Sequence, residues 1–202
     1  MDVTDLNPDE KRLLLKNFNH RLNNDLQEVL ALIKLKKRFN IDKDEIINFS
    51  CVSIASMSSI QNLMYNTNHE SDYISTAEFF DDFVKILNDY YSKSNIEFSN
   101  EIEDFYASPK KVFQLMLLVN EMLSLSLDFS FNDELEKKIS FNLEKIGEEG
   151  LLTYSDNGSG IKEIISGSEI RAVLFEQLIK QIDGTLESSD SDSIISIKFH
   201  YY

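Results

Sequence analysis

His20 is the residue of this 202-residue chain whose setting best suits group-transfer chemistry. It lies in a stretch from about Asp9 to Phe39 that lacks proline and predicts one long helix. At ~100° per residue, the apolar side chains of that helix gather on the side opposite His20. Asn24 shares the face of His20 one turn later, and Arg21 adjoins it. Histidine titrates near neutrality, so an exposed imidazole keeps a neutral, nucleophilic fraction, as phosphorylation on nitrogen requires. The alternative is a surface histidine without a role.

A second chemical signal is the sequence DNGSG at residues 156–160, which directly follows a predicted strand. The carboxylate of Asp156 could accept a hydrogen bond from an adenine amino group, and Gly158 and Gly160 would let the backbone come close to a ligand. The same residue types also form ordinary hairpin turns. Taken alone, the motif leaves both interpretations open.

The other two histidines, His69 and His200, have no Cys, His or acidic companion at metal-ligand spacing. The chain also has no Ser-His-Asp, His-Cys or Gly-x-Ser-x-Gly arrangement, so hydrolytic nucleophile chemistry has no support. We therefore expect no metal site and interpret both histidines as structural or incidental.

A helical hairpin should carry His20. A second long helix is predicted from about Glu45 to Tyr65, and two long helices with a short connection form an antiparallel hairpin. A lone hairpin cannot cover its own apolar face, so we expect a homodimer in which two copies form a four-helix bundle. The polar stretch 66–72 is the expected linker, with the hairpin in residues 1–70 and a second domain in residues 71–202.

The second domain should be a two-layer α/β fold with helices on one face of a sheet. A capping pattern at Ser75 and Glu78 opens a helix that runs to about Tyr91, and Ser108-Pro109 opens a more apolar one. A third helix is expected over about residues 168–182. Strands are predicted at 96–98, 102–105, 138–143, 151–154, 185–187 and 194–201, with the middle two paired and the last two forming a hairpin.

Composition narrows the possible partners. The net charge of -15 repels nucleic-acid phosphates and anionic lipid, so we expect neither nucleic acid nor a membrane surface as a partner. The single cysteine, Cys51, cannot form an intramolecular disulfide, which suits a reducing compartment. There is no basic leader and no run of ~18 apolar residues, so we expect a cytoplasmic protein.

The helix around His20 resembles the phosphoacceptor helix of a group of bacterial and archaeal two-component histidine kinases, which reads roughly H-R-x-K-N-N-L-Q. Residues 19–27 (NHRLNNDLQ) match it without a gap, although Asn23 replaces the Lys and Asp25 replaces the second Asn. This resemblance implies a dimeric hairpin domain that is phosphorylated on His20.

The resemblance extends into the second domain. Residues 119–123 (VNEML) are similar to the start of the family's N-box, residues 154–161 to its adenine-binding D-N-G-x-G box, and residues 181–187 (QIDGTLE) to its closing Q-L-G-G-T-L-E. It implies a Bergerat-type ATP-binding fold after the mainly α hairpin. The cofactor-binding residues would then be Glu121, Asp156, Gly158 and Gly160.

The chain departs from the family where the nucleotide phosphates would bind. The second Asn of the N-box, a Mg²⁺ ligand in the family, is replaced by Leu125, and the usual Lys by Asp128. The glycine-rich segment aligns with residues 169–172 (EIRA), which contain no glycine and begin with Glu169. Each loss costs ~1–3 kcal/mol, against a difference of ~4 kcal/mol between a micromolar and a millimolar site. We therefore expect the nucleotide site to be vestigial.

The leading hypothesis is a histidine phosphotransfer protein that relays phosphoryl groups between response-regulator receiver domains through His20. Arg21 and Asn24 would orient the group, the receiver would supply Mg²⁺, and this chain would need no cofactor of its own. Leu14 and Leu22 are candidate receiver contacts. One alternative is an active soluble histidine kinase that uses ATP and Mg²⁺; another is a non-catalytic signalling or binding module.

The charge distribution fits this hypothesis. Basic residues are predicted to make both ends of the first helix positive, whereas the acids concentrate in the second domain, with Asp128 and Glu169 where they would face ATP phosphates. We therefore interpret the negative net charge as a sign that the second domain no longer binds ATP phosphates. The basic residues are Lys11, Arg12, Lys16 and Arg21 near the start and Lys34, Lys36, Lys37 and Arg38 near the end.

Overall fold

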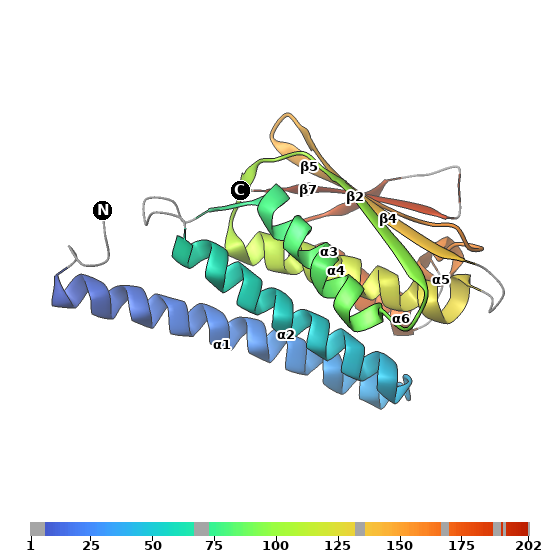
Figure 1. The fold of residues 1–202 in the computed structure, drawn as a ribbon, viewed down its shortest axis with the longest axis horizontal. Coiled ribbons are helices and arrows are strands. Elements are labelled where there is room, and N and C mark those ends of the chain that lie inside the picture. Colours follow the sequence, from blue (N-terminus) through green and yellow to red (C-terminus); the bar gives the residue numbers. More distant parts are fainter. Residues whose placement is uncertain are drawn as a thin grey trace.

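The first two helices form the predicted antiparallel hairpin. The structure is a computed structural model that describes residues 7–66, 73–131, 136–166, 170–187, 191 and 193–201. Helices α1 (Pro8–Arg38) and α2 (Lys43–Asn66) lie side by side along its length (Figure 1). Their bounds agree with the sequence prediction to within two residues at each end.

Two polar residues set the turn between these helices. Asn40 lies just beyond α1 in the left-handed region, with φ 54°, a conformation that Asn tolerates better than most residues. Asp42 then caps α2, because its Oδ1 accepts hydrogen bonds from the backbone N–H groups of Asp44 (2.8 Å) and Glu45 (3.3 Å).

The rest of the chain forms the predicted two-layer α/β domain. Its main sheet has the strand order β2-β4-β5-β7-β6, in which β2 and β4 are parallel and the other neighbours are antiparallel. A second, two-stranded sheet pairs β1 with β3. The elements in chain order are β1 (Ile74–Ser75), α3 (Thr76–Tyr91), β2 (Ile96–Ile102), β3 (Tyr106–Ala107), α4 (Pro109–Leu125), the π-helical turn η2 (Ser126–Ser130), β4 (Lys137–Ile146), β5 (Glu149–Asp156), α5 (Lys162–Ser166), α6 (Ile170–Gln181), β6 (Thr185–Glu187) and β7 (Ile194–His200).

The local sequence signals explain most of these elements. Ser75 caps α3 as predicted, since its Oγ accepts a hydrogen bond from the backbone N–H of Glu78 at 3.1 Å. The predicted strand at 102–105 is wrong: β2 is one longer strand that ends at Ile102, because it pairs with β4 over seven residues. The short elements β1, β3 and α5 were not predicted.

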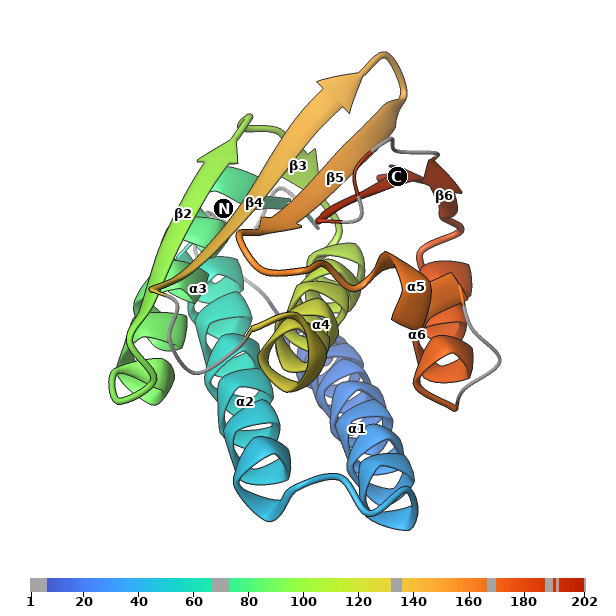
Figure 2. The same cartoon turned by 90° about the vertical axis from the view of Figure 1, so that its right-hand side faces the viewer.

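Three layers stack on one another. Helices α3, α4 and α6 cover one face of the main sheet, and the α1–α2 hairpin lies against the outer side of these helices (Figure 2). One continuous apolar core includes Val29 of α1, Phe49 of α2, Phe83 of α3 and Phe141 of β4. The hairpin is therefore packed onto the α/β domain rather than separate from it.

Helix α4 is the most deeply buried element. Residues 109–130 are long and apolar enough to cross a membrane by composition, but 83% of their most apolar stretch is buried inside the protein. This is how a core helix sandwiched between two layers behaves. Some predicted features lie outside the described residues: residues 67–72 of the expected linker, which include His69, and Glu169.

Candidate functional site

His20 lies exposed on α1, as predicted. It lines an open cavity of about 410 Å³ together with Arg12, Lys16, Asn19 and Asn23. All five residues come from α1, at spacings of three or four residues or next to one another, so they form one strip along the helix. The strip combines one imidazole with two cations and two amides, and none of these side chains is acidic.

Asn24 lies one turn beyond His20 on α1, and Arg21 directly follows His20. Asn24 is exposed and Arg21 is half-buried, but neither lines this cavity. Arg21 acts on Asp25: burial raises the pKa of Asp25 to about 6, and the positive charges of Arg21 and of Lys110 in α4 oppose that rise. Leu22, a predicted receiver contact, is half-buried and packs against the core.

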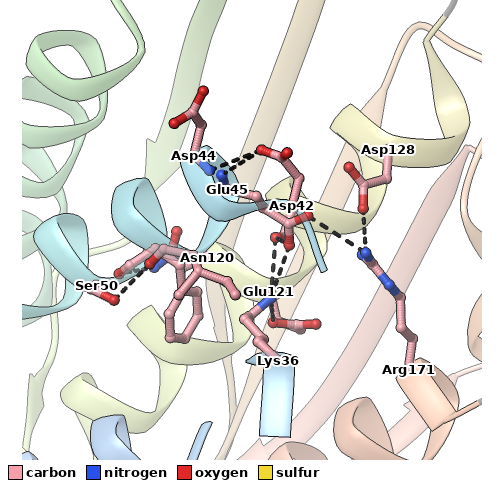
Figure 3. Close-up of polar contacts among 12 residues, drawn as sticks. Lys36, Asp42, Asp44, Glu45, Ser50, Asn120, Glu121, Asp128 and Arg171 are labelled. Atoms are coloured by element: carbon pink, nitrogen blue, oxygen red, sulfur yellow. Dashed lines mark hydrogen bonds and ion pairs between the residues drawn. The ribbon is translucent and has the colours of Figure 1, made fainter. Parts of the chain in front are cut away.

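Lys36 was predicted to contribute to a basic surface at the end of α1, and this prediction is wrong. Its side chain is fully buried, and its Nζ lies 2.6 Å from Oε2 of Glu121 and 3.1 Å from Oε1 of Glu45 (Figure 3). Nζ also donates a hydrogen bond to Oγ of Ser124 at 3.1 Å and lies over the ring of Phe49. One lysine of the hairpin thus joins both of its helices to α4.

A second cation continues this network. Arg171 of α6 pairs with Asp128 of η2, and its guanidinium lies 3.5 Å from Oε2 of Glu45. The resemblance predicted that residues 169–172 align with a phosphate-binding loop and that Asp128 and Glu169 face phosphates there. In the structure the carboxylate of Asp128 faces Arg171 instead.

The network holds three carboxylates against two cations, and the pKa shifts reflect this imbalance. Burial raises the pKa of Asp128 to about 6, together with the hydrogen bond and the negative charge of Glu45, while Arg171 opposes the rise. Burial also acts on Glu45, but Lys36, the hydrogen bonds from Ser124 and Asp128, and Arg171 outweigh it and lower its pKa. Of these two neighbouring carboxyl groups, Asp128 therefore takes up a proton at a higher pH than Glu45 does.

The Asn and Glu of the N-box-like segment face the hairpin. Glu121 is buried and paired with Lys36. Asn120 is also buried, and its Nδ2 donates to the backbone carbonyl of Phe49 (3.2 Å) and to Oγ of Ser53 (3.3 Å) in α2. Both side chains serve the contact between α4 and the helical hairpin.

The DNGSG turn is engaged by the chain itself. The buried carboxylate of Asp156 accepts hydrogen bonds from Oγ of Ser126 (2.8 Å), from Oγ of Ser130 and from the backbone N–H of Gly158 (2.9 Å). The backbone N–H of Gly160 donates to Oγ of Ser130 at 2.8 Å. A Cβ at position 158 would lie 2.2 Å from the carbonyl oxygen of Ser130, so Gly158 is required by η2 itself.

The sequence prediction did not identify the cations of the buried network or those that lie beside His20. Lys36 follows the buried Val29 and Leu32 at helical spacing, and that phase was the available signal for its burial. Arg12 and Lys16 precede His20 by two turns and one turn on its own side of the helix, which spacing alone could have shown. The pairing of Arg171 with Asp128 joins segments far apart in the chain, and no local pattern indicates it.

Comparisons with known proteins find one matching family model and several solved structures of similar fold. Residues 17–91 match the family model HisKA_2, described as histidine kinase. The structure is similar to the histidine kinase domain from the Erythrobacter litoralis EL346 blue-light activated histidine kinase, with a TM-score of 0.67 and 15% sequence identity over 93% of each chain. It is also similar to a longer structure of the EL346 kinase, with a TM-score of 0.62 and 14% identity, covering 88% of this chain and 63% of that one. No curated protein matches the sequence. The chain therefore has a histidine kinase-like fold, and the α1–α2 hairpin and α3 carry the match to the family model.

We predict that Lys36→Met lowers the free energy of unfolding at pH 7 by about 3–5 kcal/mol, because Glu45 and Glu121 stay buried without their cation. Urea denaturation followed by circular dichroism measures the change. The control is Lys34→Met, at an exposed position of α1, with an expected change within about 0.5 kcal/mol. Adding Glu121→Gln to Lys36→Met should recover part of the loss. Equal costs for Lys36→Met and Lys34→Met would contradict the ion-pair interpretation.

A second prediction concerns pH. The folded-state pKa of Asp128 is raised from 3.8 to about 6, so its protonated form stabilises the fold below pH 4, and this contribution is lost as the pH rises through 6. Asp128→Asn stays neutral and lacks this loss. The unfolding free energy of the wild type minus that of the variant should therefore fall between pH 4 and pH 7, as measured by urea denaturation at each pH. Asp25 titrates in both proteins and cancels. A difference that is constant, or that rises with pH, would refute the assignment.

Proposed function

We propose that this chain carries phosphoryl groups on His20, exchanges them with response-regulator receiver domains, and does not use ATP itself. His20 lies within the matched residues 17–91 of the histidine kinase family model and is exposed to partners. The observation that carries the proposal is a contrast: His20 is accessible, while Glu121 and Asp156 are both engaged by side chains of the chain itself.

The residues at the expected nucleotide site do not fit Mg-ATP. Leu125, at the position of the metal-ligating Asn, is apolar and fully buried. Asp156 is buried and already accepts three hydrogen bonds from within the chain, so an adenine amino group would have to compete for its remaining acceptor site.

The arrangement of the layers also disfavours direct transfer from a nucleotide to His20. Glu121 pairs with Lys36, which lies 16 residues after His20, or ~24 Å along α1 at about 1.5 Å per residue. A phosphate held beside Glu121 would therefore be far from the imidazole. The phosphoryl group must reach His20 from outside, where the helix surface is open.

The proposed transfer needs an acyl phosphate on a partner's aspartate. The unprotonated ring nitrogen of His20 attacks phosphorus, the P–N bond forms as the P–O bond to the carboxylate breaks, and the carboxylate leaves with the electron pair. The proton on the other ring nitrogen then passes to solvent, which leaves a neutral phosphoimidazole ring. Mg²⁺ held by the receiver neutralises charge in this step. Arg21 and Asn24 keep the orienting roles that the sequence predicts, and transfer to a second receiver reverses the sequence.

We also propose that two copies pair through the hairpin. Leu26, Leu30, Ile47 and Ile54 are apolar but remain 37%, 51%, 56% and 53% exposed. Ile47 also lines an open cavity of about 810 Å³ near the turn, whose lining is partly apolar and partly polar. Exposed apolar residues along both helices of a hairpin are what a four-helix bundle would bury.

An active kinase is the second candidate, because the fold matches a histidine kinase domain and Asp156, Gly158 and Gly160 are retained. It differs from the phosphotransfer proposal in one measurable respect, which is phosphorylation of His20 by ATP.

We predict that receiver domains from the source organism, labelled with [³²P]acetyl phosphate, transfer label to the wild-type chain and not to His20→Gln. His200→Gln, at an exposed position of β7, is the matched control and should be labelled like the wild type. Labelled ATP with Mg²⁺ should leave the chain unlabelled, and calorimetry should detect no nucleotide binding below a millimolar Kd. Labelling of His20 by ATP would establish the kinase instead. No transfer from any receiver, with His20→Ala functional in cells, would indicate a binding module.

A further prediction tests the dimer. Ile47→Glu combined with Ile54→Glu should convert a dimer to a monomer in light scattering coupled to size exclusion, because both charges would be buried in the bundle. Val173→Glu, at a position of α6 that is 50% exposed, should stay dimeric. A wild-type chain that is monomeric at tens of micromolar would refute the proposal.

A further inference from the structure

We propose that Arg12 and Lys16 bind the phosphoryl group beside His20, so that the open cavity on α1 is an anion site built before any partner arrives. The proposed transfer reaction gives this site its use, but the binding of phosphate itself does not depend on that reaction. Both cations lie outside residues 17–91, the part of the chain that matches the family model.

The geometry of α1 brings the two cations to the imidazole. Arg12, Lys16 and His20 follow one another at intervals of four residues, so each lies one turn from the next on the same side of the helix. Asn19 and Asn23 complete the lining of the 410 Å³ cavity. A phosphoryl group in this cavity could accept hydrogen bonds from a guanidinium, an ammonium and amide N–H groups at once.

The charges of these residues are available to a ligand. Within the described part of the chain, neither Arg12 nor Lys16 forms an ion pair, although the chain as a whole carries a net charge of -15. The nearest described acid is Asp9, which is exposed three residues before Arg12 and forms no ion pair with it, and Asp25 beyond His20 interacts with Arg21 and Lys110. Positive charges without an acidic partner favour an anionic ligand, and the ring nitrogen of His20 beside them makes a phosphoryl group the ligand we infer.

The two cations have distinct parts in the transfer. A phosphoryl group carries two negative charges, which must approach the helix before the P–N bond can form. Arg12 can hold two of its oxygens with one planar fork, and Lys16, one turn closer to His20, supplies a mobile point charge. They stabilise the phosphoryl group both while it approaches and after it is bonded to the ring. The partner protein stabilises the carboxylate that leaves.

Inorganic phosphate is the direct probe. At constant ionic strength, phosphate should shift the ring NMR signals of His20, assigned with His20→Asn, while the signals of His200 stay unchanged. Arg12→Gln with Lys16→Gln should weaken this binding about fivefold, since each exposed charge contributes modestly. The matched control, Lys34→Gln with Arg38→Gln, removes one Lys and one Arg from exposed positions of α1 outside the cavity and should bind phosphate like the wild type.

The same variants separate this inference from the relay. Equal phosphate affinity in the Arg12/Lys16 variant and its control, or no shift of His20 in the wild type, would overturn the anion site whether or not receivers transfer phosphate. A fivefold loss specific to the Arg12/Lys16 variant supports the site even if no receiver labels His20, in which case only the proposed relay fails. Where a receiver does label His20, the variant should transfer about fivefold more slowly than its control.

Discussion

The burial of one positive charge sets the arrangement of this molecule. Lys36 is fully enclosed, and only Glu45, Glu121 and Ser124 together satisfy its ammonium group. A buried ion pair contributes little net stability compared with apolar residues of similar volume, but each member is costly to leave unpaired. The need to pair Lys36 therefore favours one position of the hairpin on the α/β domain. In that position, α1, α2 and α4 meet at Lys36.

This contact also explains what happened to the residues of the expected nucleotide site. Asn120 and Glu121 lie on the face of α4 that receives the hairpin, where Asn120 donates hydrogen bonds to α2 and Glu121 pairs with Lys36. Asp156 accepts hydrogen bonds from η2, which directly follows α4. Buried polar residues are destabilising if left unpaired. Under the proposal that this chain does not use ATP, these internal contacts engage groups that a nucleotide would otherwise bind.

Local patterns predicted the helices and caps well, because signals such as the capping serine and the residues of the turn act over a few residues. The same logic predicted that His20 would be exposed. The prediction was wrong for Lys36. A lysine is usually exposed, whereas the helical spacing that Lys36 shares with Leu32 indicated the core. The prediction also failed for β2, whose length depends on its pairing with β4. The ion pair of Arg171 with Asp128 depends on tertiary packing, which no local pattern contains.

The continuity of α1 links the core to the accessible histidine. Helix α1 is a single unbroken helix (Figure 1). It holds Val29, Leu32 and Lys36 in the interior and carries the exposed His20 about two to four turns before them. The direction in which the imidazole points is therefore set by the rotation of the helix about its own axis, which the buried residues fix. One residue inserted between these two parts would turn the imidazole by ~100°, whereas seven would return it close to its original bearing. The spacing between His20 and the buried residues thus matters as much as the residues themselves.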